Sequence, residues 1–352
     1  MTGRERVLAA LDGLEPDRIP IALAFFSVDT ATLAPDGAWS DDLVDVLFVD
    51  FPVSAQEQEL RRRALPYAGN SRIGSAGQVA RYGSWSYRPE VPGDGNPLER
   101  ATSLADLEAF PFPDVRAPRA VDGLTEQVAE LHRRGLAAGG NTPHLGGELF
   151  EAAWRIRGLE NFLTDLVRRK EMADYLLDRL TDLACRNAET LALAGVDVLA
   201  LDDDVGLTRG MMMMSPATWR EFFRPRLGAI IAAARAVAPD IRVVYHSDGW
   251  FEAIVDDLVE LGVAAINPLQ PEYMDPVRIR RRYGSRLALW GTVGRQTTFS
   301  FAGPAEIRAE VRARVDTLGR RGLVLCPAYD IDEPDIPWAN VAAFLEAGRE
   351  FG

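Results

Sequence analysis

The chain has 352 residues, a formal net charge of −13 and a hydrophobic fraction of 47%. These values are typical of a globular, enzyme-sized protein, and its negative charge argues against a nucleic-acid or anionic-membrane surface. Two cysteines give no disulfide framework, and no apolar stretch is long enough to cross a membrane. Because residues 1–14 also lack the apolar core of a signal peptide, we expect a cytoplasmic protein.

Apolar periodicity predicts an N-terminal helix, then eight buried strands that alternate with helices. The expected strands span residues 19–26, 46–49, 136–140, 196–201, 241–245, 263–267, 286–291 and 323–326. The expected helices span residues 2–14, 103–110, 120–134, 148–155, 158–167, 169–194, 215–237, 250–261, 275–283, 303–318 and 337–349. A small hairpin near 79–89 interrupts this alternation, within an insertion at about 72–118.

Eight strands alternating with helices is the count of a closed (β/α)8 barrel. We therefore expect one α/β domain of the TIM-barrel class over residues 1–352, with an N-terminal helical segment. An open, doubly wound sheet is the alternative architecture. However, no predicted strand is followed by the Gly-x-Gly-x-x-Gly fingerprint of a dinucleotide site.

The most informative stretch is VVYHSDGW, residues 243–250, where a buried strand ends in a histidine and an aspartate. Polar groups at the C-terminal end of a parallel strand are where α/β enzymes carry their chemistry. The alternative is that Asp248 caps the next helix and His246 is an ordinary buried histidine. The pairing of both residues at one strand end favours a functional role.

In a barrel, the C-terminal ends of all strands meet at one mouth. The fourth strand ends in Asp202–Asp204. We expect crowding of like charges to raise the pKa of at least one of these carboxyls, as in a functional site. The alternative is that the aspartates only accept hydrogen bonds from loop amides. From the strand ends we predict two groups of site residues. The catalytic group is Asp203, His246, Asp248 and Tyr329, and the substrate-binding group is Phe25, His144, Arg209, Asn267, Gln270 and Arg295.

We expect no resident metal; if one binds, His246 and Asp248 are the predicted ligands. A tight zinc site usually has more nitrogen and sulfur ligands than this pair supplies. Cys326 is close to a strand end, but its position suggests that it belongs to the strand itself. The four consecutive methionines, Met211–Met214, cannot share one helix face, and we expect them to fill space beneath a loop.

Several segments together are typical of one family. They are RERVLAAL at 4–11, EPDRIP at 15–20, DDDVG at 202–206, Ser215-Pro216 with Phe222 and Pro225, HSDG at 246–249, and the segments 262–268 and 283–291. On these motifs the chain resembles the uroporphyrinogen decarboxylase-like superfamily from end to end, as a divergent member. The resemblance implies a (β/α)8 barrel, often a homodimer, with its active site at the mouth.

The resemblance implies one of two chemistries. True uroporphyrinogen decarboxylases remove carboxyl groups without a cofactor and carry an arginine-bearing segment after the first strand. Residues 24–29, AFFSVD, contain no arginine, so uroporphyrinogen itself is not the expected substrate. The corrinoid-dependent methyltransferases of the superfamily bind zinc, which activates a thiol acceptor, through a His-x-Cys pair and a later cysteine. Here Asp248 stands in place of the first cysteine and Tyr329 in place of the later one.

On these grounds we expect a cofactor-free decarboxylase, a carbon–carbon lyase acting on a small carboxylated substrate. Asp203 and His246 would share proton transfer and charge stabilisation, while Arg295 anchors the substrate carboxylate. The alternative is a corrinoid- or metal-dependent methyltransferase. It would need a corrinoid protein as partner, because the sequence has no cobalamin-binding signature of its own. A ligand-binding barrel without catalysis is the third possibility.

Overall fold

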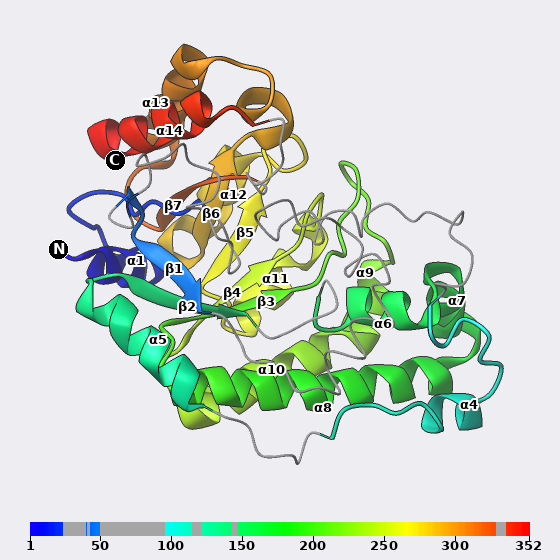
Figure 1. Cartoon of the computed structure of the whole chain (residues 1–352). Helices are drawn as coiled ribbons and strands as arrows, with labels where there is room; N and C mark the ends of the chain where they lie inside the picture. Colours follow the sequence, from blue (N-terminus) through cyan, green and yellow to red (C-terminus); the bar gives the residue numbers. More distant parts are fainter. Residues whose placement is uncertain (24–39, 41–42, 50–95, 115–120, 142–146, 329–335) are drawn as a thin grey trace.

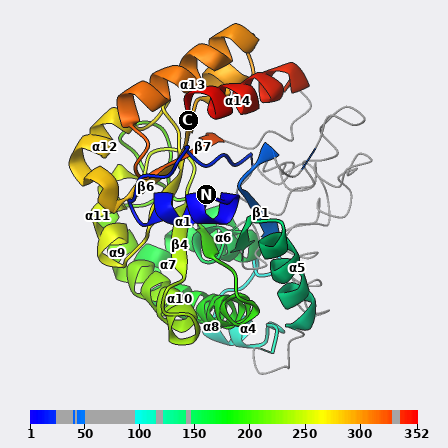
Figure 2. The same ribbon diagram turned by 90° about the vertical axis from the view of Figure 1, so that its left-hand side faces the viewer.

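The computed structural model describes residues 1–23, 40, 43–49, 96–114, 121–141, 147–328 and 336–352. Within them, seven strands form one parallel sheet in chain order. The sheet curls around its own interior and helices cover its outer face (Figures 1 and 2). The strands are β1 (Val46–Val49), β2 (Ala137–Asn141), β3 (Val198–Asp202), β4 (Arg242–His246), β5 (Ala265–Leu269), β6 (Ala288–Val293) and β7 (Leu323–Pro327).

The helices match the predicted alternation closely. They are α1 (Gly3–Leu11), α4 (Leu104–Glu108), α5 (Asp122–Arg133), α6 (Phe150–Arg157), α7 (Leu159–Arg168), α8 (Lys170–Ala194), α9 (Pro216–Phe222), α10 (Arg224–Val237), α11 (Val255–Glu260), α12 (Pro276–Tyr283), α13 (Pro304–Leu318) and α14 (Trp338–Phe351). The helix predicted at 215–237 is two helices, α9 and α10, that meet at Phe223. Pro225 explains the break, because it lacks an N–H and its ring clashes with the preceding turn.

The strand predicted at 19–26 is only partly within the described residues. There, Ile21 forms an isolated parallel bridge with Leu325 of β7, and the Asp45 N–H donates to the Ile21 carbonyl at 2.8 Å. This segment therefore lies between β7 and the start of β1, where an eighth strand would be. The structure confirms an α/β fold with a curled seven-stranded parallel sheet. The hairpin predicted near 79–89 lies outside the described residues.

The interior of the curled sheet is filled by alternate residues of its strands. A buried cluster brings together Val198 and Ala200 of β3, Val244 of β4 and Trp290 of β6, among others. Their odd-numbered neighbours on β3 and β4, such as Leu201 and Tyr245, instead pack in the core between the sheet and the helices. Because side chains alternate along a strand, this pattern decides which residues at the strand ends face inward.

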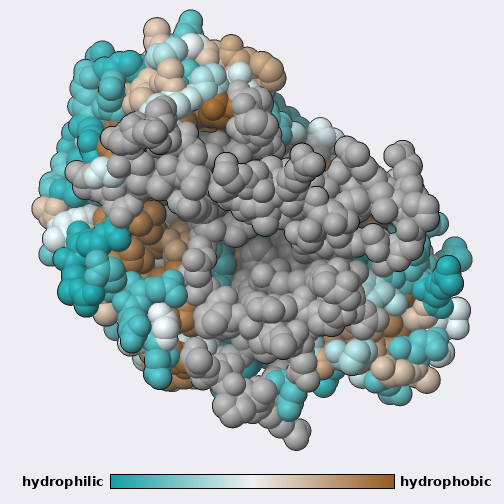
Figure 3. Space-filling view, in the orientation of Figure 1, coloured by the Kyte–Doolittle hydropathy of each residue, from teal (hydrophilic) through white to brown (hydrophobic). Residues whose placement is uncertain are grey.

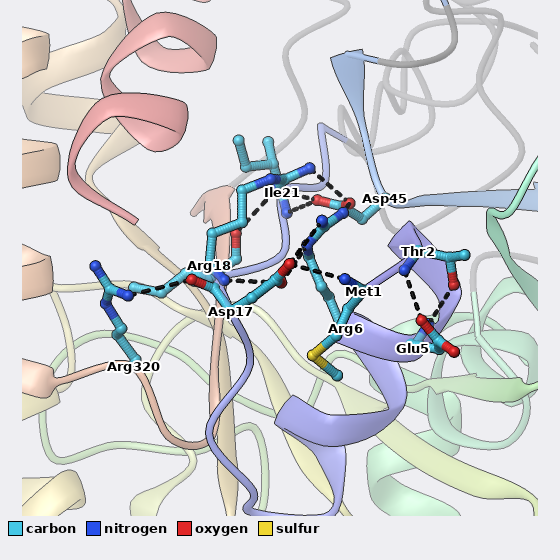
Figure 4. A network of polar contacts seen from close by, with 10 residues as sticks. Met1, Thr2, Glu5, Arg6, Asp17, Arg18, Ile21, Asp45 and Arg320 are labelled. Carbon is cyan, nitrogen blue, oxygen red and sulfur yellow. Dashed lines mark hydrogen bonds and ion pairs between the residues drawn. The ribbon is translucent and has the colours of Figure 1, made fainter.

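Helix α1 covers the N-terminal end of the sheet, and its Val7, Ala10 and Leu11 belong to the interior cluster. Beside it, the buried Asp45 carboxylate accepts two hydrogen bonds from Arg18, at 2.6 and 2.8 Å, and one from the Ile21 N–H at 2.8 Å (Figure 4). Arg6 pairs with both Asp45 and Asp17. These charge-assisted contacts tie α1, the first strand segment and β1 together.

Charged and polar side chains dominate the outer edge of the described part of the molecule (Figure 3). Apolar side chains show mainly in the gaps between them. None of the described helices combines the length and the apolar character that crossing a bilayer requires.

Candidate functional site

Acidic side chains and a histidine gather at the C-terminal ends of β3 and β4. The two strands pair in register, with Asp202 opposite His246. Asp202 follows Val198 and Ala200 on the inward-facing side, and His246 follows Val244. Both side chains, and that of Asp204, are therefore directed into the interior at the end of the sheet where α/β barrels carry their active sites.

His246 is oriented by its neighbour on β5. Its Nδ1 lies 2.6 Å from the Asn267 Oδ1, and the Asn267 amide nitrogen donates to the Trp290 carbonyl at 3.4 Å. Since the amide oxygen can only accept, Nδ1 carries the ring proton in this arrangement. The Nε2 atom faces Asp202 and Asp204, whose Oδ1 atoms lie 3.8 and 3.7 Å away.

Asp203 does not face His246, contrary to our prediction. It points to the outer side of the sheet, where its Oδ1 accepts a hydrogen bond from the Glu151 N–H at 3.1 Å at the start of α6. Strand β3 runs through Asp202, one residue further than predicted. Because Val198 and Ala200 face the interior, alternation directs Asp202 and Asp204 inward and Asp203 outward. The pair expected to share a proton, Asp203 and His246, is therefore not formed.

Burial governs the protonation of these carboxyls. It raises the pKa of Asp204 to about 6 and that of Asp203 to about 7. The pKa of Asp202 lies well above its ordinary value, first because of burial and then because of the Asp204 charge. Desolvation and like charges both disfavour the ionised forms of Asp202 and Asp204, so a positive charge placed beside these two carboxylates would be stabilised.

A second layer of buried charge lies on and just before α6, and the sequence analysis missed it. Glu151 and Arg155 form an ion pair at 3.1 Å with both side chains almost fully buried. Burial raises the pKa of Glu151 well above its ordinary value. Glu148 accepts a hydrogen bond from the Asp202 N–H. In sequence, Glu151 and Arg155 look like an i,i+4 pair on a solvated helix face, so no local signal marks them.

The loops that follow β3 and β4 hold each other in place. The buried Ser247 hydroxyl accepts hydrogen bonds from the N–H groups of Val205 and Gly206, at 3.1 and 3.2 Å. Asp248 donates its own N–H to the Asp204 Oδ1 at 2.6 Å. At Gly206 an added Cβ would lie 2.1 Å from the Asp248 carbonyl oxygen, so only glycine permits this approach. The contacts fix Asp204 relative to His246.

The predicted substrate-binding residues are dispersed. Asn267 orients His246, and Gln270 accepts a hydrogen bond from the Gly249 N–H at 2.6 Å, so these two side chains support the site from within. Arg209 is exposed and donates to the Glu272 carbonyl at 3.0 Å. Arg295 begins a π-helical turn after β6. The other predicted residues, Phe25, His144 and Tyr329, lie outside the described residues.

The thiolate–zinc set implied by the family resemblance does not fit the part of the chain that the structure describes. Cys326 is buried among apolar side chains of the sheet interior, and Cys185 lies on α8. Among the described residues, the side chains that come together as a metal-ligand group are instead Asp202, Asp204 and His246, with their ligand atoms within 4.8 Å of one another. Asp248, the partner predicted for His246, does not belong to this group.

Comparison with known proteins gives two curated relatives of nearly the same length. Both are described as "Methylcobamide:CoM methyltransferase MtaA", one from Methanosarcina barkeri and one from its strain Fusaro / DSM 804. Each is 24% identical over 99% of this chain and 98% of its own. A solved structure, "methyltransferase from Methanosarcina mazei", has a TM-score of 0.69 and 19% identity over 100% of this chain and 99% of its own, which shows the shared fold.

The curated relatives overturn the expectation of a cofactor-free decarboxylase. They are named for methyl transfer rather than for carbon–carbon cleavage, and they match this chain from end to end. The methyltransferase alternative is therefore the better supported interpretation. The model of the family described as "Uroporphyrinogen decarboxylase (URO-D)" matches residues 98–351, which is more than half of the chain and confirms the resemblance seen in the motifs. The chain belongs to the uroporphyrinogen decarboxylase (URO-D) family, as a divergent member.

Proposed function

We propose that this protein is a methyltransferase that moves a methyl group from a methylcobamide to a small nucleophile bound at the C-terminal end of the sheet. The observation that carries the proposal is the end-to-end relationship to the methylcobamide:CoM methyltransferases. Because the sequence has no cobalamin-binding signature of its own, the donor would be presented by a partner corrinoid protein. The Pro20–Ala22 segment would begin the eighth strand of a closed barrel around this site.

The chemistry of methyl transfer defines what the site must do. The acceptor attacks the methyl carbon with a lone pair, and the cobalt–carbon bond breaks with both of its electrons left on the corrinoid. An acceptor that starts as X–H also loses a proton. Stabilising the ionised acceptor therefore requires positive charge close to its reacting atom.

The site residues suit a role in holding that positive charge. Asp202 and Asp204 direct carboxylate oxygens toward the His246 Nε2, and Asn267 fixes the ring that carries it. Arg155, the basic side chain behind the cluster, is paired with Glu151. An anionic nucleophile would be repelled by these carboxylates unless a counter-charge were present. The geometry thus favours an acceptor that reacts beside a positive charge held by Asp202, Asp204 and His246.

Methyl transfer can be tested with methylcobalamin as the donor. The purified protein is incubated with a panel of thiol, amine and alcohol acceptors, including 2-mercaptoethanesulfonate. Loss of the methyl–cobalt absorbance is followed, and the methylated acceptor is identified by mass spectrometry. We expect transfer to at least one acceptor. We also expect His246→Ala to lower turnover by roughly 100-fold or more, the typical effect of removing one preorganised stabilising group.

His132→Gln is the matched control, because His132 lies on α5 at the other end of the sheet, 2.8 Å from Asp197. It should retain turnover. A folded protein that transfers no methyl group to any acceptor, from free methylcobalamin or from a methylated corrinoid protein, would refute the proposal.

A further inference from the structure

Two carboxylates and one imidazole converge in a way that suits a metal ion. The ligand atoms of Asp202, Asp204 and His246 lie within 4.8 Å of one another, and all three residues are buried. Asp202 and His246 end the adjacent strands β3 and β4, whose register places them opposite each other, and Asp204 follows β3 in a loop held by the Asp248 N–H. Side chains carried on such rigid elements are already in position before a metal ion binds.

An independent observation concerns the histidine. Its Nδ1–H is committed to the Asn267 Oδ1 at 2.6 Å, which leaves Nε2 as the atom facing the two carboxylates. A metal-binding histidine typically donates its other ring N–H to an oxygen acceptor, which fixes the tautomer and orients the ring. Asn267 makes this contact here, and its own amide nitrogen is held by the Trp290 carbonyl.

A third observation concerns Asp204. Its side chain is only 6% exposed, and its Oδ2 is buried without a hydrogen-bond partner among the described residues. Its Oδ1 accepts the Asp248 N–H and lies 3.7 Å from the His246 Nε2. A buried carboxylate oxygen without a partner is costly, and coordination of a cation is one way to satisfy it.

We propose that Asp202, Asp204 and His246 bind one divalent first-row transition-metal cation, through two carboxylate oxygens and the histidine Nε2 and without a sulfur ligand. This set differs from the His-x-Cys and later cysteine of the family's zinc site. The site goes beyond the proposed function and does not depend on it, because metal binding is measured without turnover. If the proposed function also holds, the cation supplies the positive charge beside the acceptor.

The ligand types indicate which ions and acceptors the site prefers. Carboxylates suit manganese and other hard cations, while imidazole also suits iron, cobalt and zinc. Three protein ligands leave coordination positions open, as in catalytic rather than structural sites. A site without thiolates offers harder ligand atoms, oxygen and nitrogen in place of sulfur, than the family's zinc site does. We therefore expect acceptors that bind through oxygen or nitrogen to be favoured over thiols.

Cobalt substitution tests the ligand set directly. The full-length protein is dialysed against a chelator and titrated with Co²⁺, and bound metal is measured by equilibrium dialysis and elemental analysis. We expect one Co²⁺ per chain, with visible d–d absorption and without the intense near-ultraviolet band that thiolate ligands give. Binding should also release protons, because carboxyl ligands must be ionised.

Conservative variants identify the ligands. Asp202→Asn, Asp204→Asn and His246→Ala should each weaken Co²⁺ binding by roughly 100-fold or more, and Asn267→Ala by roughly 10- to 100-fold through loss of ring orientation. Asp203→Asn is the matched control within the same tripeptide, because its side chain faces α6. Asp248→Asn and Cys326→Ser test the family-like alternative. Both should keep one Co²⁺ per chain, and near-ultraviolet circular dichroism should show that each variant is folded.

Three results would overturn the proposal. One is binding of less than one Co²⁺, Mn²⁺ or Zn²⁺ per chain at millimolar metal. Another is a thiolate charge-transfer band that Cys326→Ser removes. The last is loss of binding in Asp248→Asn together with intact binding in Asp204→Asn. None of them bears on methyl transfer, so a failed metal site and a failed methyltransferase assignment remain distinguishable.

Discussion

The two ends of the sheet bury acidic side chains in opposite ways. At the N-terminal end, Asp45 is held by Arg18, Arg6 and a backbone N–H, and Asp197 by Arg4, His132 and the Ala138 N–H. At the C-terminal end, Asp202 and Asp204 lie beside each other and beside His246. Arg155 is close to that cluster, but it pairs with Glu151.

The difference separates residues that hold the fold from residues retained for chemistry. A buried carboxylate surrounded by arginines is compensated, and removing it leaves uncompensated cations. A buried carboxylate beside other carboxylates costs stability, as the raised pKa values of Asp202 and Asp204 indicate. Natural proteins keep such unfavourable clusters mainly where function needs them. The comparison therefore predicts opposite responses to the same kind of mutation.

The largest effect is expected at the N-terminal end. Asp45→Ala leaves Arg18 and Arg6 facing each other and the buried Ile21 N–H without its acceptor. Breaking a buried pair from one side should lower the free energy of unfolding by about 3–5 kcal/mol, measured by urea denaturation. Asp17→Ala is the control, because its side chain is 45% exposed and should cost less than about 1 kcal/mol. Equal losses in both variants would show that the buried pairing is not what stabilises this end.

The opposite response is expected for Asp204→Asn in chelator-treated protein. Burial raises the pKa of Asp204 from 3.8 to about 6, so the folded state binds the proton more tightly than the unfolded chain does. This contribution to stability is complete below pH 3.8 and is lost as pH rises through about 6. At pH 8 the ionised carboxylate thus costs about 3 kcal/mol, which the uncharged Asn should recover.

The pH dependence supplies the check on Asp204→Asn. The gain in unfolding free energy should be largest at pH 8 and should disappear near pH 4. Saturating divalent metal should stabilise the parent protein and abolish the advantage of the variant, since a ligand that binds only the folded state adds to its stability. A variant that is less stable than the parent at pH 8 without metal would contradict the contrast between the two ends.

Much of the fold is predictable because buried parallel strands and amphipathic helices carry strong local signals. All seven strands of the sheet were expected, within two residues or so at most ends. The split between α9 and α10 was missed because Pro225 was treated as compatible with one helix. The position of the site was also predictable, since Asp202–Asp204 and His246 lie at strand ends.

The roles within the site depended on details that local sequence does not carry. Which aspartate faces inward is decided by the phase of the side-chain alternation along β3, where Val198 and Ala200 face the interior. The sequence does not reveal that phase, because a parallel strand buried on both faces is apolar at every position. The burial of Glu151 and Arg155 depends on how α6 packs against the end of the sheet. The choice between decarboxylation and methyl transfer was wrong, because both chemistries of the superfamily use the same barrel and motifs.

A smaller effect is expected where neutral hydrogen bonds hold the loops at the C-terminal end. Ser247→Ala removes the acceptor of two backbone N–H groups, those of Val205 and Gly206, at a fully buried position. The loss should be about 2 kcal/mol of unfolding free energy. Hydrogen exchange at these two amides should also accelerate. Ser215→Ala, which removes the N-cap of α9, is the comparison and should cost about 1 kcal/mol without affecting them. Unchanged exchange in Ser247→Ala would show that other contacts hold these loops.

The smallest effect concerns backbone strain, which also lies at the C-terminal end. Thr292 of β6 is buried and has a φ of 82°, the only positive value at a non-glycine position among the described residues. A β-branched residue is strained there, and such strain gathers at functional sites. Thr292→Ala keeps Cβ and Thr292→Gly removes it, so their difference reports the backbone conformation together with the loss of one buried methyl group. The glycine variant should be the more stable by about 1 kcal/mol in urea denaturation.

At the adjacent Val293, whose φ is not positive, the order should reverse, with Val293→Gly less stable than Val293→Ala by roughly 0.5–1 kcal/mol. If glycine is the less stable variant at both positions, Thr292 stores no strain, and the contrast between the two ends of the sheet rests on charge alone.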